Sequence, residues 1–120
     1  MLERRENIIV EKSEHFADRI VKMHQYLSSK KAGNSDILKQ IVRSGTSIGA
    51  NISESKFAQS EADFLTKMTI SLKEANETVY WFEVISGLCG DYDEIKTLSQ
   101  EASELRNLLQ RIVHSIKNNS

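Results

Sequence analysis

The sequence predicts an all-α fold: an antiparallel up-down-up-down four-helix bundle formed by a single domain over residues 1–120. Proline is absent, so long helices can run without losing a backbone hydrogen-bond donor. Apolar residues recur at alternating steps of three and four, which is the spacing of one buried helical face. Turn-forming residues interrupt this spacing at three places and divide the chain into four helical segments.

The four helices are expected over about residues 3–30, 36–57, 61–88 and 92–117. The buried stripes predicted for them, in chain order, are Ile9, Phe16, Ile20, Met23 and Leu27; Leu38, Ile41, Gly45, Ile48 and Ile52; Leu65, Met68, Leu72, Ala75, Val79 and Phe82; and Ile95, Leu98, Ala102, Leu105, Leu109, Ile112 and Ile116. The fourth segment keeps its alternation throughout and is the best specified. Short connections make sequential helices antiparallel neighbours.

The first two breaks contain residues that end one helix and begin the next. Gly33-Asn34 can end a helix in the left-handed region, and Ser35 or Asp36 can cap the helix that follows. In the second break Ser60 is the expected N-cap, and Asp63 follows three residues later, as in a capping box.

Composition and charge narrow the classes of function. The net charge is −1 and the isoelectric point is about 6.3, so the chain as a whole is not a basic nucleic-acid-binding protein. No apolar run approaches the roughly 18–20 residues that a bilayer-spanning helix needs. The single cysteine, Cys89, cannot form an internal disulfide. These features predict a soluble, cytoplasmic protein with no membrane partner.

Positive charge is concentrated in the first half of the chain. The segment from Arg19 to Arg43 contains six basic residues and one acidic residue, Asp36. The six are Arg19, Lys22, Lys30, Lys31, Lys39 and Arg43. In an oligomer such a patch would be repeated and its field would add. This segment is therefore the candidate nucleic-acid contact.

The third segment carries apolar residues outside its stripe. Ile70 lies two residues from Met68, which at about 100° per residue places it on nearly the opposite side of the helix. The other residues on that side or beside it are Glu77, Tyr80, Trp81 and Val84. Three interpretations fit: a wide core stripe, a subunit interface, or a surface for a different partner. If Glu77 is partly buried it needs a basic partner, for which Arg43 and Lys73 are candidates.

The second segment is rich in small residues between positions 44 and 55. Gly45 and Gly49 are one helical turn apart, and small side chains let neighbouring helices approach closely. The alternative is a ligand site lined by Ser47, Asn51 and Glu54. A phosphate-binding loop is excluded, because the Lys-Ser/Thr pair of that motif is missing.

Catalytic and metal-binding motifs are missing. Helical bundles often hold metals through Glu-x-x-His pairs, but Lys12, Val21 and Arg111 stand three residues before the three histidines. No nucleophile lies on a strand-to-helix elbow. We expect no enzymatic activity, no cofactor, no metal and no small-molecule substrate.

Three stretches resemble a known family. They are Arg43-Ser44-Gly45-Thr46-Ser47-Ile48-Gly49-Ala50-Asn51-Ile52-Ser53-Glu54, the segment from Phe64 to Ala75 with its Ser-Leu-Lys-Glu-Ala run, and Glu77-Thr78-Val79-Tyr80-Trp81. Their order and spacing resemble the bacterial four-helix-bundle proteins encoded in intervening sequences of 23S rRNA genes, the S23-like family. The resemblance covers nearly the whole chain and is strongest over residues 43–82.

The resemblance implies a four-helix protomer that assembles into a ring-shaped homopentamer. The family looks related to the accessory proteins of diversity-generating retroelements, which are basic pentamers that bind reverse transcriptase and nucleic acid. This chain differs from those proteins in its near-neutral charge.

Two functional hypotheses follow. The first is a non-enzymatic, homo-oligomeric binding protein associated with RNA or with a nucleic-acid-handling protein. The alternative is a structural or protein-binding assembly module that has no nucleic-acid role.

Overall fold

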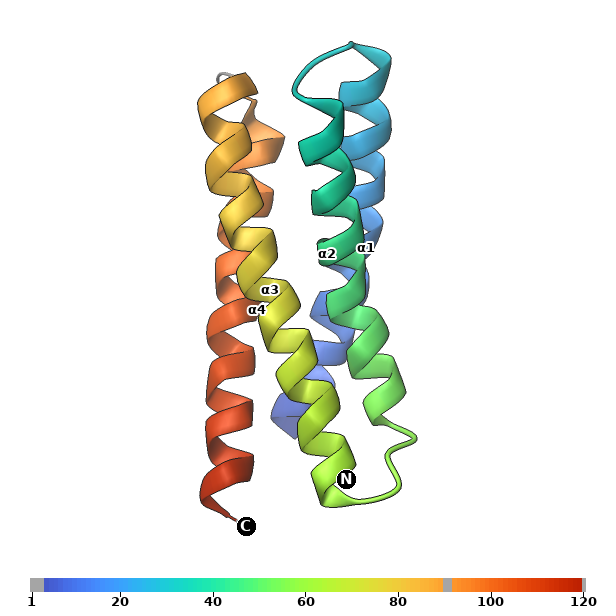
Figure 1. Ribbon diagram of the computed structural model, residues 1–120, viewed down its shortest axis with the longest axis vertical. Coiled ribbons are helices and arrows are strands. Elements are labelled where there is room, and N and C mark those ends of the chain that lie inside the picture. Colours follow the sequence, from blue (N-terminus) through green and yellow to red (C-terminus); the bar gives the residue numbers. More distant parts are fainter. Residues whose placement is uncertain (1–3, 90–91, 120) are drawn as a thin grey trace.

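The computed structural model describes residues 4–89 and 92–119, which form four α-helices (Figure 1). The helices are α1 (Arg4–Ser29), α2 (Ser35–Ser55), α3 (Glu61–Cys89) and α4 (Asp93–Asn118). Each helix packs against its neighbours in the chain, and α1 also packs against α4, which closes the bundle. The Cα atoms extend over 47 × 22 × 21 Å. The predicted all-α four-helix bundle is confirmed.

The turn between α1 and α2 is capped one residue earlier than expected. The side-chain oxygen of Asn34 accepts hydrogen bonds from the backbone N–H groups of Asp36, at 3.0 Å, and Ile37, at 3.1 Å. Asn34 is therefore the N-cap of α2, and the prediction of Ser35 or Asp36 is wrong. Gly33, with φ 75°, adopts the predicted left-handed conformation, but Asn34 is extended with φ −97°. Helix α1 ends earlier than Gly33, at Ser29, where left-handed Lys31 (φ 53°) follows and the Ala32 N–H donates to the Leu27 carbonyl at 2.9 Å.

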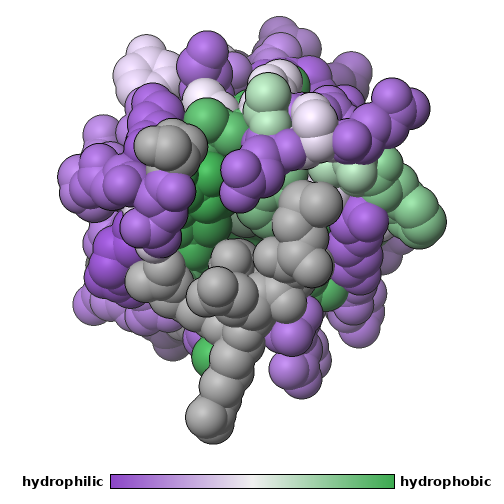
Figure 2. Space-filling model, turned by 90° about the horizontal axis from the view of Figure 1, so that it is seen from below, coloured by the Kyte–Doolittle hydropathy of each residue, from purple (hydrophilic) through white to green (hydrophobic). Residues whose placement is uncertain are grey.

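The turn between α2 and α3 has the predicted cap. The Ser60 hydroxyl accepts a hydrogen bond from the Asp63 backbone N–H at 3.0 Å, and the Asp63 carboxylate accepts one from the Gln59 N–H at 3.2 Å. Phe57 lies in this turn with 82% of its surface exposed. Viewed from this end of the bundle, hydrophobic atoms lie between hydrophilic ones (Figure 2).

The predicted core stripes of α1, α2 and α4 are buried, apart from Ile116, which is half-buried. The stripe predicted for α3 is partly wrong, because Leu65 and Leu72 are only half-buried. The residues of α3 that are buried at heptad spacing are Phe64, Met68, Ser71, Ala75, Thr78, Phe82 and Ile85. The true stripe is therefore rotated toward positions that hold two hydroxyl side chains.

Both hydroxyls contact α2, and Thr78 also bonds the Glu74 carbonyl of its own helix at 2.7 Å. Ser71 donates to the backbone carbonyl of Ile48 at 2.9 Å, and Thr78 lies 2.9 Å from the hydroxyl of Ser44. Ser44 in turn bonds the carbonyl of Gln40, four residues earlier, at 2.7 Å. A satisfied buried hydrogen bond contributes about 1 kcal/mol, whereas an unsatisfied one is costly. The Ser71 hydroxyl, which needs the Ile48 carbonyl, thus favours one rotation of α3 against α2.

The two glycines of α2 lie against α1, as the close-packing interpretation predicted. A β-carbon at Gly45 would lie 3.4 Å from the side chain of Ile20, and one at Gly49 would lie 3.4 Å from the hydroxyl of Ser13. Both distances are at the near limit of ordinary contact, so a methyl group fits but nothing larger does.

Within the described residues, no helix is long and apolar enough to cross a membrane.

Substitutions at Gly45 test this close approach. Gly45→Ala should leave the free energy of unfolding unchanged or raise it by up to about 1 kcal/mol, because alanine is the better helix former. Gly45→Val should lower it by about 1–3 kcal/mol through overpacking against Ile20. Gly87 is the matched control, because no atom lies within 4 Å of a β-carbon built there. Urea denaturation followed by circular dichroism measures both; equal responses of Gly45→Val and Gly87→Val would contradict close packing.

Candidate functional site

The side of α3 that faces away from the core carries the apolar residues singled out in the sequence. We call the set Ile70, Glu77, Tyr80, Trp81 and Val84 the outer α3 face. Ile70 is 37% exposed and Tyr80 is 55% exposed, while Trp81 and Val84 are each partly exposed. Trp81 also packs against the core cluster, so the wide-stripe interpretation describes part of its surface. The rest of this face has no covering element within the described bundle.

Arg43 of α2 holds two carboxylates of this region together. Its guanidinium forms ion pairs with Glu77 and, at 3.2 Å, with Glu74. The Nε–H of the same guanidinium donates to the side-chain oxygen of Gln40 at 3.1 Å. Glu77 is half-buried and paired with Arg43, one of the two partners that the sequence offered. The planar guanidinium suits such shared contacts better than a lysine would.

The Arg43 cluster also orients the aromatic side chains. The indole N–H of Trp81 donates to the Glu77 carboxylate at 3.2 Å. The Tyr80 ring meets the Trp81 ring edge to face, with centroids 5.1 Å apart and planes at 68°. Because these contacts restrict the rotamers of both rings, the face is ordered before any partner arrives. Preorganisation of this kind lowers the entropy cost of binding.

The polar residues of α2 beside this face do not form an open ligand site. Ser47 donates to the carbonyl of Arg43 at 2.6 Å, and the Asn51 amide donates to the carbonyl of Ser47 at 2.9 Å. Glu54 pairs with Lys67 of α3 at 3.6 Å. These polar contacts of the three residues, two hydrogen bonds and one ion pair, are thus made to α2 itself or to α3. This arrangement favours close packing over the ligand-site alternative.

The six basic residues between Arg19 and Arg43 do not converge on one surface. Arg19 faces α4, where it bonds Glu101 and, at 3.1 Å, Glu94. Arg43 faces α3, on the opposite side of the bundle. Burial lowers the pKa of the Arg19 guanidinium, but its hydrogen bonds to the two carboxylates outweigh that effect and raise the pKa above the ordinary value.

The remaining basic residues lie outside the α1–α4 and α2–α3 contacts. Lys22 pairs with Asp18 one turn away at 2.9 Å, and the Lys30 ammonium lies 5.8 Å from the centre of the Tyr26 ring. Lys30, Lys31 and Lys39 are exposed around the α1–α2 turn and have no carboxylate partner among residues 4–89 and 92–119. The candidate nucleic-acid contact therefore reduces to these three lysines at one end of the bundle.

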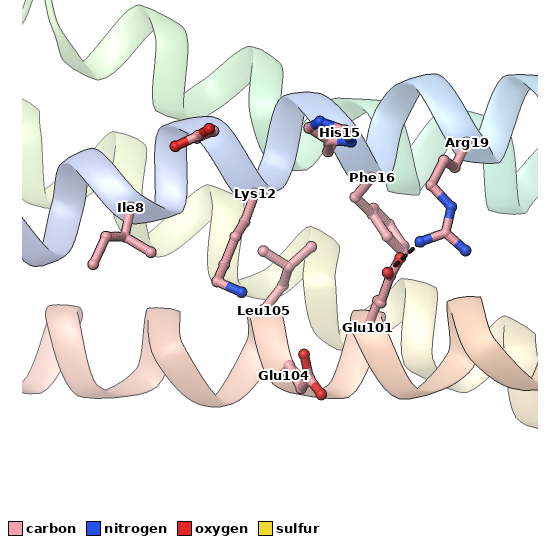
Figure 3. A pocket seen from close by; sticks show the side chains of 9 residues that line it. Ile8, Lys12, His15, Phe16, Arg19, Glu101, Glu104 and Leu105 are labelled. Carbon is pink, nitrogen blue, oxygen red and sulfur yellow. Dashed lines mark hydrogen bonds and ion pairs between the residues drawn. The ribbon is translucent and has the colours of Figure 1, made fainter.

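A groove lies between α1 and α4, on the side opposite α2 and α3 (Figure 3). The contact between these two helices is the least extensive of the four in the bundle. Buried Phe16 and Leu105 form its floor, and Ile8, which is 44% exposed, lies at one end. The groove encloses about 370 Å³, and its remaining lining is charged or polar: Glu11, Lys12, His15, Arg19, Glu101 and Glu104.

Metal-ligand geometry does not occur in the described part of the chain, where no three His, Cys, Asp or Glu side chains come together.

Residues 5–118 match the family of 23S rRNA-intervening sequence proteins. The chain belongs to this family. A crystal structure of a protein of unknown function from the S23 ribosomal protein family of Bacteroides thetaiotaomicron is similar in sequence and fold. The two are 41% identical with a TM-score of 0.83, over 92% of this chain and 98% of that one. No curated protein matches the chain.

In this intervening-sequence protein, the sequence offered Arg43 both as a nucleic-acid contact and as a partner for Glu77, and the structure pairs it with Glu77 and Glu74. The sequence feature that indicates this pairing is Glu74-x-x-Glu77. Two like charges on one side of a helix repel each other, and a nearby cation relieves the repulsion. The α1–α4 groove was missed altogether. Its one visible sign in the sequence was exposed Ile8, which sits beside the core residue Ile9.

Replacing Arg43 tests the carboxylate cluster. Arg43→Ala should lower the free energy of unfolding by about 1 kcal/mol at low ionic strength, because two carboxylates lose one shared cation. Lys22→Ala, which breaks a single exposed pair within α1, should cost about 0.5 kcal/mol or less. In about 1 M salt the Arg43 effect should shrink, since the screening length falls to roughly 3 Å. A salt-independent loss would show that Arg43 acts through its aliphatic stem.

Proposed function

We propose that the protein is a non-enzymatic binding protein that acts as a homo-oligomer assembled through the outer α3 face. The observation that carries this proposal is a helix that is apolar on two sides, one in the core and one at the surface, with exposed Ile70 and Tyr80 on the second. Buried apolar area contributes roughly 25 cal/mol per Å², so covering this face with a second copy favours association.

Two further features support assembly. Tyrosine and tryptophan are enriched at protein interfaces, and here the two rings are held in place by the Arg43–Glu77 cluster. The resemblance to the S23-like family suggests a ring of five protomers, and we propose that stoichiometry. The single cysteine is typical of a reducing compartment, so we place assembly in the cytoplasm.

Assembly is tested by the mass of the protein in solution. Light scattering should give a multiple of the 13.7 kDa chain mass, five-fold for the proposed ring. Ile70→Arg should shift the protein toward monomer while circular dichroism shows unchanged helicity, because a charge placed in an apolar contact is costly. Val21→Arg is the matched control, since Val21 is 39% exposed on α1, away from this face. A monomeric wild-type protein would refute the proposal.

RNA association is a second candidate function, favoured by one observation. Lys30, Lys31 and Lys39 gather at one end of the bundle without carboxylate partners in the described residues, whereas Arg19, Lys22 and Arg43 are paired. In a ring, this end of every protomer would lie on the same side, so three lysines per chain would form a repeated positive surface. Contacts with phosphates would make the binding strongly dependent on salt.

Fluorescence anisotropy with labelled RNA tests this candidate. Lys30→Ala/Lys39→Ala should weaken binding several-fold at low salt and reduce the salt slope by about two, the number of cations removed. Lys56→Ala/Lys96→Ala is the control, because these lysines are also exposed but lie elsewhere on the bundle. Equal losses in both variants would indicate non-specific attraction. If the wild-type protein binds no RNA at low salt, the assembly-module alternative stands alone.

A further inference from the structure

The outer α3 face and the α1–α4 groove are two unlike surfaces on opposite sides of one bundle. Going round the bundle, α2 and α3 share one seam and α4 and α1 share the seam across from it. In Figure 1, α2 lies in front of α1, and the upper part of α3 lies in front of α4. One surface has exposed Ile70 and Tyr80, and the other is a groove with an apolar floor of Phe16 and Leu105.

The α1–α4 groove can accept side chains from another helix. In Figure 3 the side chains of Lys12, Phe16 and Arg19 project from α1 toward α4, and the groove that they line encloses about 370 Å³. A row of side chains from a helix fits such a space, as in other helix-in-groove contacts. A bundle side of 47 by 22 Å also has room for the roughly 800 Å² per partner that stable interfaces bury.

The charges that remain unpaired are complementary as well. On α3, Lys73 lies one turn from both Ile70 and Glu77, is exposed, and has no acidic partner among the described residues. In the groove, Glu11 and Glu104 are exposed and have no basic partner within the described chain. Lys12 is the one unpaired lysine of the groove lining. The unpaired groups in the groove are therefore two carboxylates and one ammonium, and their net charge is negative. A lysine arriving on α3 of another molecule would meet that charge.

We infer that protomers associate head to tail, with the outer α3 face of one copy seated in the α1–α4 groove of the next. This inference rests on the proposed function, which requires only that the outer α3 face be an interface, and adds what that face contacts. Such a contact is heterologous: each copy uses both surfaces, with two different neighbours. Repetition of the contact closes into a ring when the rotation between copies divides a full turn.

Two variants separate the two surfaces. The face variant, Ile70→Ser/Tyr80→Ser, removes exposed apolar groups from α3 and leaves the groove intact. The groove variant, Ile8→Ser/Glu104→Lys, removes an exposed apolar group, reverses a rim charge and leaves α3 intact. The control, Val21→Ser/Glu14→Lys, makes matched changes at exposed positions of α1 outside both surfaces. Circular dichroism checks that every variant keeps the wild-type helicity.

Native mass spectrometry of the variants, alone and mixed, gives the test. Each of the two surface variants should be monomeric alone, whereas the control keeps the wild-type mass. An equimolar mixture should form a heterodimer, because the intact α3 of the groove variant fits the intact groove of the face variant. Assembly then stops at the heterodimer, because its two free surfaces are the altered α3 face of one variant and the altered groove of the other.

Other outcomes overturn the inference in distinguishable ways. If the groove variant keeps the wild-type mass while the face variant dissociates, α3 is an interface but the groove is not its partner. If both dissociate and the mixture gives no heterodimer, like surfaces pair with like. Either result refutes head-to-tail association through the groove and leaves the outer α3 face as an interface. Pairing of like surfaces would also exclude the proposed ring of five, because a ring needs contacts between unlike surfaces. A monomeric wild-type protein refutes both.

Discussion

The close contact of α2 with both of its neighbours sets the geometry on which the rest of the bundle depends. On one side Gly45 lets α2 approach the Ile20 side chain of α1. On the other side Ser71 of α3 must reach the Ile48 carbonyl to be satisfied, whereas Thr78 bonds the Glu74 carbonyl of its own helix and also meets the Ser44 hydroxyl. A buried Ser71 hydroxyl without a partner would cost more than most single contacts contribute, so this bond favours one rotation of α3.

That rotation has a consequence at the surface. With Ser71 and Thr78 turned toward α2, Ile70 and Tyr80 are directed outward. The same rotation brings Glu74 and Glu77 beside Arg43, which forms ion pairs with both, and Glu77 in turn accepts a hydrogen bond from the indole of Trp81. The exposure of this apolar face therefore follows from the hydrogen bonding of the buried side chains. Contacts inside the protomer restrict the side chains of the face, and no partner is needed for that.

The fold was largely predictable because most of the core is aliphatic. In α1, α2 and α4 the residues predicted from apolar spacing are buried except for half-buried Ile116, and the predicted spans differ from the helices by a few residues. The spacing did not identify the buried residues Ser13, Ser44, Ser55 and Val113. In α3 the predicted stripe was displaced toward Leu65 and Leu72, because a search for apolar residues passes over core positions that hold serine or threonine. The burial of Ser71 depends on an acceptor in α2, 23 residues earlier in the chain, and the pattern within a single helix contains no such information.

The candidate surfaces were predictable to a lesser degree. The outer α3 face followed from helical spacing, and one of two proposed partners for Glu77 was found. Arg19 and Arg43 were grouped in one segment of the sequence, but they lie on opposite sides of the bundle. Nearness in sequence does not show which neighbouring helix a side chain faces. The groove depends on the separation of α1 and α4, whose facing residues are about as far apart in sequence as the chain allows. Assembly thus has support from this chain's own residues, and RNA association from three lysines at one end.

Trp81 is the one tryptophan in the chain, and it lies in the proposed interface, so its fluorescence tests the central claim directly. Emission and acrylamide quenching are measured over a dilution series in parallel with the molecular mass. If the outer α3 face is buried between protomers, the emission should shift to longer wavelength and quenching should increase over the concentrations at which the oligomer dissociates. A change in mass with constant Trp81 emission and quenching would show that assembly uses another surface and would contradict the account.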